Sequence, residues 1–354
     1  MKLSIRAICV KVIIAIIVIQ LGAVQKNATA QDFHLSQFDA FQQYFNPAMT
    51  GMFNGDLRVN AHFRQQWASI IENPYQTFGV SLDAANVNLG SFPPALQNLR
   101  LGGFVLNYQA GAGTYNVLNV IFSVAKNYAI KQSDHHVAVG IQTGVINKFV
   151  NMDALSFQRQ YNNANGGGFN TQIPNGENFT NTSVFLPELN TGLLYNYAKL
   201  NSRFNPFLGV AAYHLTQPNE TFFNVTNRLP IRFVLNTGSK INIHKQHQAH
   251  LHVLTMMQKN VIQVQSNIMG NFFISPNSED IAIIYGFSYR TLNNSDAGII
   301  HLGAKYRDFT GRVSYDINIS DLKNFSSGRG AIEISLVYIR TKPIKAANVS
   351  CPRL

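Results

Sequence analysis

Between residues 57 and 64, apolar and polar side chains alternate without interruption. The apolar positions are Leu57, Val59, Ala61 and Phe63, and the polar positions are Arg58, Asn60, His62 and Arg64. Successive side chains of a β-strand point to opposite faces, so this period of two predicts a strand with one apolar face and one basic, polar face. Such a strand suits a solvated antiparallel sheet, and equally the wall of a water-filled lumen whose other side meets lipid.

The same alternation recurs along the chain, most cleanly in residues 137–145, 300–307 and 313–319. Two further segments, 99–110 and 281–291, are apolar on both faces and fit a sheet with one solvated face less well. Together these patterns predict fourteen strands, at residues 57–67, 76–86, 99–110, 115–130, 136–150, 184–199, 204–216, 230–244, 248–258, 261–275, 281–291, 297–309, 311–320 and 330–341.

The number and continuity of these strands favour one closed sheet. Soluble sandwich domains have about 100 residues each, yet no linker or change of composition divides the chain. Bacterial single-chain barrels have an even number of strands, and closure removes both sheet edges. We therefore predict an all-β fold, a transmembrane outer-membrane β-barrel of about 14 antiparallel strands over residues 57–341. A soluble, exported, β-rich adhesin is the alternative.

The first thirty residues have the pattern of a secretory signal. A positively charged start precedes an apolar core at residues 12–24, and Ala28-Thr29-Ala30 forms an A-x-A cleavage pattern. The core is shorter than the roughly 20 residues that a spanning helix needs. We predict export, with cleavage after Ala30.

Removal of residues 1–30 changes the charge and the cysteine content of the chain. It takes away four basic residues and no acidic one, which lowers the net charge from +11 to +7. No Lys/Arg run exceeds two residues, so we predict no nucleic-acid partner. Only Cys351 remains, which excludes a disulfide within the chain.

The connections between strands predict an orientation. If the amino-terminal end of the barrel faces the periplasm, the long connections 151–183 and 217–229 both lie outside, as is usual for barrels. The connection 87–98 is long for a periplasmic turn, and we expect it to cap the lumen or to dock a partner.

No motif for catalysis or cofactor binding is present. The chain lacks a Gly-x-Ser-x-Gly elbow, a His-Glu-x-x-His helix and a phosphate-binding loop. His244, His247, His250 and His252 crowd one hairpin, but no nearby cysteine or carboxylate completes a metal site. We predict no enzymatic activity, no catalytic residue, no cofactor and no metal.

The functional candidate is the stretch from residue 31 into the first strand. Its aromatic residues would be costly to expose, so we expect residues 31–56 to pack into the barrel mouth or against a partner. Arginines on the polar face of the following strand could hold a carboxylate of that partner. A periplasmic plug with internal arginine ladders is an equal alternative. The candidate partner-binding residues are Tyr44, Asn46, Pro47, Thr50, Gly51, Asn54, Gly55, Asp56, Arg58, Arg64, Gln66 and Trp67.

This stretch also carries a resemblance to a known family. The order SQF…YFNPAMTG.FNGD.RVNAHFRQQW…PYQTFGVSLD, between Ser36 and Asp83, resembles the amino-terminal signature of the PorP/SprF family of Bacteroidetes outer-membrane proteins. That family is associated with the type IX secretion system and gliding motility. The ending Cys351-Pro352-Arg353-Leu354 is similar to the family's usual tail, although Leu354 stands where a barrel usually has an aromatic residue.

The resemblance implies a non-enzymatic outer-membrane component of the secretion and gliding machinery. Its partners would be membrane lipid, other secretion subunits and the carboxyl-terminal domain of a secreted adhesin-like protein. In this hypothesis the periplasmic segment 31–56, the turn 87–98 and the periplasmic tail 342–354 dock subunits, while the outer loops hold the secreted protein. A passive porin-like channel or transporter is the alternative.

Overall fold

The computed structural model describes residues 32–87, 98–112, 114–130, 133–163, 167–177, 179–199, 202–292 and 294–340. The expected signal segment 1–30, most of the connection 87–98 and the tail 342–354 lie outside these residues. Among the described residues, no helix combines the length and the apolar character needed to cross a membrane.

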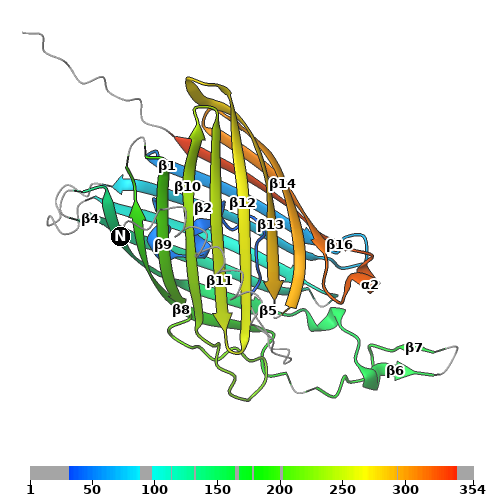
Figure 1. Ribbon diagram of the computed structural model, residues 1–354. Coiled ribbons are helices and arrows are strands. Elements are labelled where there is room, and N and C mark those ends of the chain that lie inside the picture. Colours follow the sequence, from blue (N-terminus) through cyan, green and yellow to red (C-terminus); the bar gives the residue numbers. More distant parts are fainter. Residues whose placement is uncertain are drawn as a thin grey trace, which may run out of the picture.

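Fourteen antiparallel strands of the described chain close into one barrel (Figure 1), which confirms the predicted fold class. Neighbouring strands follow chain order, β5 pairs with β8, and β1 pairs with β16 to complete the ring. The strands are β1 (Leu57–Gln66), β2 (Tyr75–Val87), β3 (Leu99–Ala110), β4 (Tyr115–Ala129), β5 (His135–Phe149), β8 (Ser183–Tyr197), β9 (Phe204–Tyr213), β10 (Arg232–His244), β11 (His247–Gln258), β12 (Val261–Ser275), β13 (Ser278–Leu292), β14 (Asn294–Tyr306), β15 (Phe309–Asn318) and β16 (Arg329–Arg340).

The closing pair runs the full length of β1, from Leu57 opposite Arg340 to Gln66 opposite Ala331. The observed strand ends differ from the predicted ones by a few residues. The largest shortening is in β9, which ends at Tyr213 because His214 takes a positive φ of 59° and turns the chain out of the ladder.

The two faces of the barrel wall differ in polarity as the alternation predicts. Large apolar side chains point outward along the strands, among them Phe122 and Phe185, which are 66% and 72% exposed. Polar side chains such as Asn60, Gln142 and Glu333 point inward and are buried. An apolar exterior around a polar interior is the arrangement of a membrane barrel, and the reverse of a soluble protein.

Strand β3 is apolar on both faces for a structural reason. Its inward residues Phe104 and Leu106 are buried against Phe41 and Tyr44 of the amino-terminal segment. The inward face of this strand therefore meets protein rather than water. Strand β13 likewise turns Ala282 and Ile284 inward, where both are buried.

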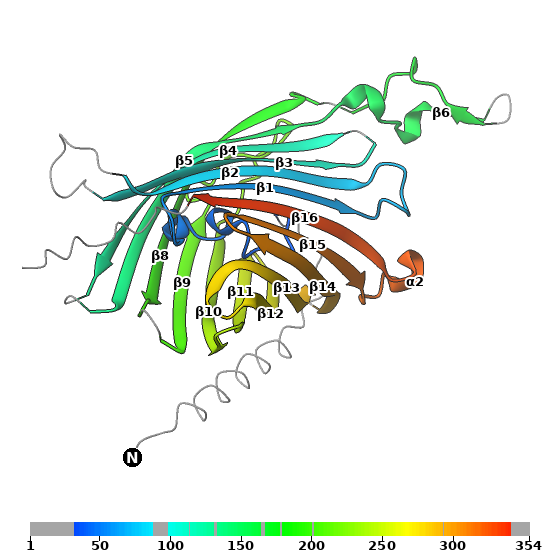
Figure 2. The same cartoon turned by 90° about the horizontal axis from the view of Figure 1, so that it is seen from above.

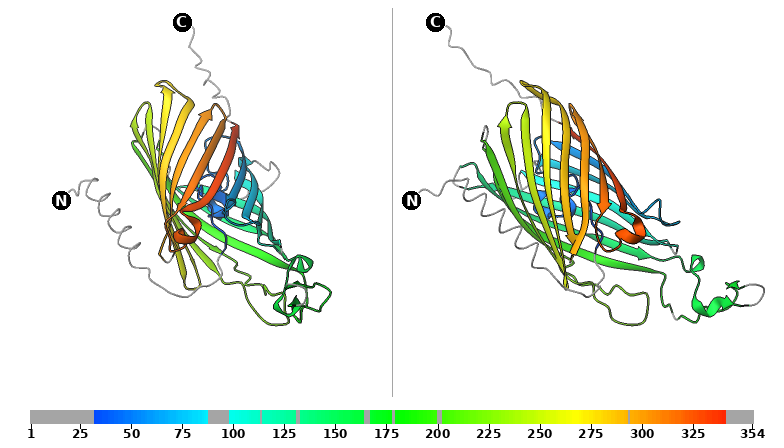
Figure 3. Two further views of the ribbon diagram at one scale, coloured as in Figure 1. Left: turned by 90° about the vertical axis from the view of Figure 1, so that its right-hand side faces the viewer. Right: turned by 45° about the vertical axis from the view of Figure 1, so that its right-hand side comes forward.

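The two ends of the barrel carry different connections (Figures 2 and 3). One end, here the long-loop end, holds residues 150–182 and 214–231 and the short helix α2 (Lys323–Ser326). Residues 150–182 include a small hairpin that the sequence did not predict, β6 (Tyr161–Asn162) with β7 (Gly168–Phe169). The opposite end, here the short-turn end, holds the start of β1 and the end of β16.

The amino-terminal segment runs through the barrel (Figure 2). Residues 32–53, here the lumenal segment, include two 3₁₀ turns, η1 (Gln42–Tyr44) and η2 (Pro47–Met49). The segment begins beside His214 at the long-loop end, and the chain reaches Arg340 at the short-turn end by residue 56. We predicted a periplasmic segment over residues 31–56; the structure corrects this by placing residues 32–53 inside the barrel, where Phe38, Phe41, Tyr44 and Phe45 are buried.

Candidate functional site: the filled lumen

A ring of fourteen strands encloses more space than its own inward side chains can fill. Eight-stranded barrels are just filled by side chains, whereas barrels of 16–18 strands leave an aqueous channel. Here the lumenal segment occupies that space, and its contacts with the wall define the site. Apart from a charged cluster around Arg232, the wall is charged on one side and apolar on the other.

Glu333 of β16 organises the charged side. The backbone N–H groups of Ser36 and Gln37 donate to its two carboxylate oxygens at 2.8 and 2.5 Å. Arg64 Nη1 lies 2.9 Å from Oε2, and His62 Nε2 lies 3.0 Å from Oε1. One fully buried carboxylate thus joins the lumenal segment to β1 and β16.

Asp316 of β15 makes a second junction next to Glu333. The hydroxyl of Ser36 donates to Asp316 Oδ1 at 2.7 Å, and Arg290 Nη2 donates to Oδ2 at 2.9 Å. Arg64 Nη1 lies 3.0 Å from the same oxygen. These buried charges compensate one another, which a low-dielectric interior requires.

A third junction, nearer the short-turn end, joins β1, β2 and the lumenal segment. Arg58 donates to both oxygens of Asp83 at 2.9 and 2.7 Å, a bidentate pair. Asp83 Oδ2 also accepts the N–H of Gly51 at 2.7 Å, and Arg58 Nη1 donates to Gln42 at 2.9 Å. The carboxylate that the sequence led us to expect from a partner is supplied here by the same chain.

The opposite side of the lumen is an apolar core. Aromatic residues of the lumenal segment pack edge-to-face, with Phe41 and Phe104 ring centroids 5.6 Å apart and Phe38 and Phe45 centroids 6.0 Å apart. Such pairs add about 0.5–1.5 kcal/mol to the free energy gained by burial. The wall of this core comprises Phe104, Leu106, Ile121, Ala211, Tyr213, Val234, Leu254 and Met256.

Glycines on β5, β8 and β9 make room for the turn at Asn46 and Pro47. A Cβ atom on Gly140 would lie 2.3 Å from the backbone of Pro47, and one on Gly192 would lie 2.2 Å from Asn46 Oδ1. Asn46 accepts the N–H of Ala48 and donates to Asn236 at 3.0 Å. The turn therefore sits in a groove that only glycine permits.

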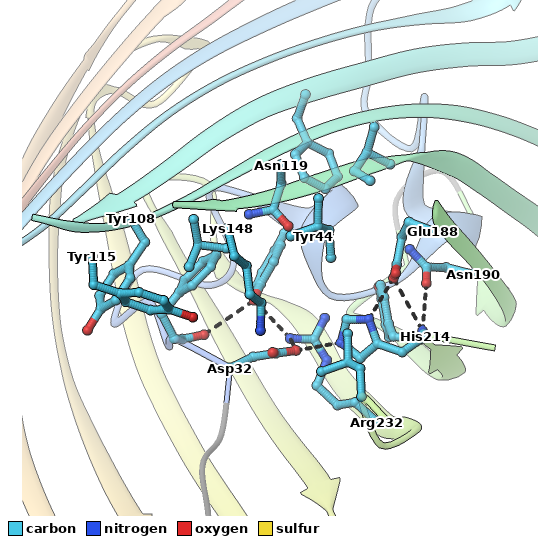
Figure 4. A pocket seen from close by; sticks show the side chains of 17 residues that line it. Asp32, Tyr44, Tyr108, Tyr115, Asn119, Lys148, Glu188, Asn190, His214 and Arg232 are labelled. Carbon is cyan, nitrogen blue, oxygen red and sulfur yellow. Dashed lines mark hydrogen bonds and ion pairs between the residues drawn. The ribbon is translucent and has the colours of Figure 1, made fainter. Parts of the chain in front are cut away.

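A cavity of about 120 Å³ remains at the long-loop end, between the start of the lumenal segment and the wall (Figure 4). Asp32 and Phe33 of the lumenal segment line it, together with Tyr115 and Lys148 of the wall. The cavity is large enough for several water molecules or a small organic group.

Charges around the cavity shift the titration of groups in and beside the lumenal segment. Burial alone would raise the pKa of Asp32, but His214 and Arg232 hold it well below its usual range. Burial alone would lower the pKa of His214, but the Asp32 and Glu188 carboxylates raise it to about 9. At neutral pH the site therefore holds a carboxylate against an imidazolium and a guanidinium.

The structure brings most of the predicted residues together in and around the lumen. Tyr44, Asn46, Pro47, Thr50 and Gly51 are buried in the lumenal segment. Of the other predicted residues, Arg58 and Arg64 lie on β1 and are buried. Asn54, Gly55 and Asp56 precede β1 near the short-turn end; Asn54 is exposed and the other two are half-buried. Gln66 and Trp67, at and just after the end of β1, are half-buried.

Two of these residues form contacts away from the lumenal segment. Asp56 accepts two hydrogen bonds from Arg340, both at 3.0 Å, at the barrel seam. Trp67 directly follows β1, has a positive φ of 60° and packs edge-on against Tyr75 at the long-loop end. A partner-binding role for the twelve residues stays a prediction; the buried ones have their contacts within this chain.

The acidic partners of the arginines and the cations at the cavity were not predicted from the sequence. Glu333 and Asp316 each stand as a single acid between apolar neighbours on an alternating strand, a pattern that places a carboxylate on the inner face. Arg232 and His214 flank the loop 214–231 and gave no comparable signal. Their roles follow only from the path of the lumenal segment.

Known proteins include similar solved structures and one matching family. The solved structure of the Ralstonia pickettii toluene transporter TbuX is similar, with 10% identity, a TM-score of 0.47, and coverage of 90% of this chain and 97% of that chain. The structure of a Pseudomonas aeruginosa FadL homologue is also similar, with 8% identity, a TM-score of 0.44, and coverage of 90% of this chain and 95% of that chain. No curated protein sequence matches the chain. Residues 27–338 match the family described as type IX secretion system membrane protein PorP/SprF, and the chain therefore belongs to the PorP/SprF family of membrane β-barrel proteins.

Proposed function

We propose that this protein is a non-enzymatic outer-membrane component of the type IX secretion and gliding machinery. It docks other secretion subunits, the carboxyl-terminal domain of a secreted adhesin-like protein, or both. Family membership supports a place in the machinery. The filled lumen is the observation that carries the docking role, because a barrel closed by its own chain offers its two rims for binding.

The outer membrane is the location that the sequence and the wall support. The apolar outer face suits lipid, and the pattern of residues 1–30 suits export. The predicted topology puts the long-loop end at the cell surface. There it would meet a secreted protein, while the short-turn end would meet periplasmic subunits.

The two long connections form one surface at the long-loop end. The N–H of Thr180 donates to the carbonyl of Phe222 at 2.9 Å, which ties residues 150–182 to residues 214–231. Phe179 packs against Phe223 with ring centroids 4.7 Å apart, and Phe157 packs against Phe179 at 6.1 Å. Phe223 is exposed, and Phe157 and Phe179 are half-buried. Aromatic side chains that reach the surface in a polar surround are typical of protein-binding surfaces.

A passive channel or transporter is the alternative, and the cavity beside Asp32 is the observation that favours it. A continuous path through the barrel would need the lumenal segment to move. Phe41 and Phe45 lie across that path and are fully buried. The docking function is therefore favoured over a passive channel.

Affinity purification of the tagged full-length protein tests the proposal. We expect secretion subunits or an adhesin-like protein to be recovered with it. Phe223→Ser should reduce the recovery of a protein bound at the long-loop end, whereas Val225→Ser should not, because Val225 is exposed in the same loop but lies outside the aromatic cluster. Recovery of neither class of partner would overturn the docking function.

A further inference from the structure

The first two described residues occupy a well-defined site at the long-loop end (Figure 4). Asp32 Oδ2 lies 2.7 Å from His214 Nε2 and 2.9 Å from Arg232 Nη1. The Phe33 ring stacks between two tyrosines, 5.1 Å from Tyr44 and 5.5 Å from Tyr108, with interplanar angles of 17° and 13°. A carboxylate clamp and an aromatic slot thus lie side by side, and a consecutive acidic–aromatic pair fills both.

The cations of the clamp are held in place by groups other than Asp32. The Arg232 guanidinium lies 4.3 Å from the ring centroid of Tyr213 and 4.8 Å from that of Tyr44, and it donates to the Tyr44 hydroxyl at 2.8 Å. His214 Nδ1 lies 2.8 Å from Glu188 Oε1. The clamp would therefore keep its shape if Asp32 left.

The charge of Arg232 decides what could replace Asp32. Within the described part of the chain, Asp32 is the one carboxylate paired with this buried guanidinium. Leaving a buried charge uncompensated is strongly unfavourable, so an occupant that displaces Asp32 has to bring an anion of its own. A carboxylate fits, because the arginine and the imidazolium can both donate to it.

An incoming peptide can exchange with this end of the lumenal segment and not with residues further along it. The side chain of Asp32 is 21% exposed, and Phe33 and His34 are half-buried, whereas Leu35, Ser36 and Gln37 are fully buried. The cavity of about 120 Å³ lies against the same clamp and slot, which leaves room for an incoming chain.

The wall of the cavity also offers polar atoms that have no partner. Glu188 Oε2 and Tyr213 Oη are buried without a hydrogen bond, and both residues line the cavity. A peptide backbone laid along this wall would supply the N–H and C=O groups that these atoms can bind.

We propose that Arg232, His214, Tyr44 and Tyr108 form a binding site for a peptide segment with an acidic residue followed by an aromatic residue. The chain's own Asp32–Phe33 occupies this site until a segment of the docked protein exchanges with it. The inference rests on the proposed function, because the incoming segment belongs to a docking partner, and it names the chemistry by which that partner is recognised.

Direct binding of short peptides to the full-length protein in detergent tests this inference. The probe is N-acetyl-Asp-Phe-amide, and the matched control is N-acetyl-Asn-Phe-amide. The double variant Asp32→Ala/Phe33→Ala vacates the site, so we expect it to bind the probe about tenfold more tightly than the unmodified protein, in which the bound segment competes. Arg232→Gln in the same background should abolish the preference for the acidic probe.

Equal binding of the two probes by the vacated site, or an unchanged preference after Arg232→Gln, would overturn the inference. If the double variant does not assemble, Asp32→Asn keeps the shape of the side chain and weakens the competing contact. The same comparison of probes then applies.

The result also separates this inference from the proposed function. Failure of the probe to bind while affinity purification still recovers partners overturns the binding site alone. Probe binding without recovered partners overturns the docking function.

Discussion

The two sides of the lumen hold the same segment by different physical means. On the side of β13, β15, β16, β1 and β2, buried carboxylates and arginines hold the segment through short hydrogen bonds. On the side of β3, β4 and β9–β11, aromatic and aliphatic side chains pack against it. The difference teaches that the charged side fixes the position of the segment, while the apolar side supplies burial.

The two kinds of contact also differ in tolerance. Apolar packing adapts to changes of shape when volume is conserved, at a cost usually below about 1.5 kcal/mol. Removing one partner of a buried ion pair leaves an uncompensated charge and costs about 3–5 kcal/mol. Matched substitutions on the two sides can therefore break or support the comparison.

The largest effect is expected for Glu333→Gln, which keeps the shape of the side chain and removes its charge. Arg64 and His62 lose their shared carboxylate, and the N–H groups of Ser36 and Gln37 lose a charged acceptor. We expect the free energy of unfolding in detergent to fall by about 3–5 kcal/mol. Urea titration followed by circular dichroism measures it.

Leu254→Met is the matched change on the apolar side, because Leu254 is buried in the core around the lumenal segment. The substitution conserves side-chain volume, so we expect the free energy of unfolding to fall by less than about 1.5 kcal/mol. A Leu254→Met loss as large as that of Glu333→Gln would contradict the division of roles between the two sides.

An effect smaller than that of Glu333→Gln is expected for Gly140→Ala, which alters only the wall. The added Cβ would meet the backbone of Pro47, so the turn at residues 46–47 has to shift. We expect overpacking to cost about 1–3 kcal/mol. Labelling by maleimide at Ala40→Cys, a buried position of the segment, in a Cys351→Ser background should become faster.

Gly298→Ala is the control for this prediction, because its nearest neighbour, Phe287, is 3.7 Å from the position of an added Cβ. Its rate of labelling at Ala40→Cys, in the same Cys351→Ser background, should equal that of the protein without a glycine substitution. If Gly140→Ala and Gly298→Ala behave alike, the glycine groove does not position the turn.

The smallest effect concerns pH at the first residues of the segment. Asp32 and Glu188 face His214 and raise its pKa to about 9, while Arg232 faces Asp32 from β10. A raised pKa stabilises the contact fully below the ordinary value near 6.5, and this stabilisation is lost as pH rises through about 9. Raising the pH from 7 to 10 should therefore loosen Asp32, with Arg232 still holding it.

Spin-label mobility at His34→Cys, in a Cys351→Ser background, measures this loosening. Mobility should rise between pH 7 and pH 10, and His214→Gln should remove the pH dependence. An equal pH dependence in both proteins would assign the change to a group other than His214.

The wall of the barrel could be predicted from the sequence because its signal is local. Alternation of period two gives both the strands and the face that each residue occupies, as in residues 57–64. β3 looked anomalous for a reason that lies elsewhere in the chain: Phe104 and Leu106 face the lumenal segment. The hairpin of β6 and β7 is too short to show any periodicity.

The filling of the lumen could be predicted only in part. Arg58 and Arg64 stood out on the polar face of the first strand, and a periplasmic plug with internal arginine ladders was one of two equal interpretations. The path of the segment depends on contacts between residues far apart in sequence, such as Ser36 with Asp316 and Asp32 with His214. No local pattern encodes which inward side chains meet across a lumen.

Conductance in planar lipid bilayers tests the central claim most directly, namely that the chain closes its own barrel. The unmodified protein should show no steady open pore, because residues 32–53 fill the lumen. A variant that lacks residues 32–53 should conduct steadily, since fourteen strands alone leave an open interior. Steady conductance of the unmodified protein, equal to that of the deletion variant, would contradict the account.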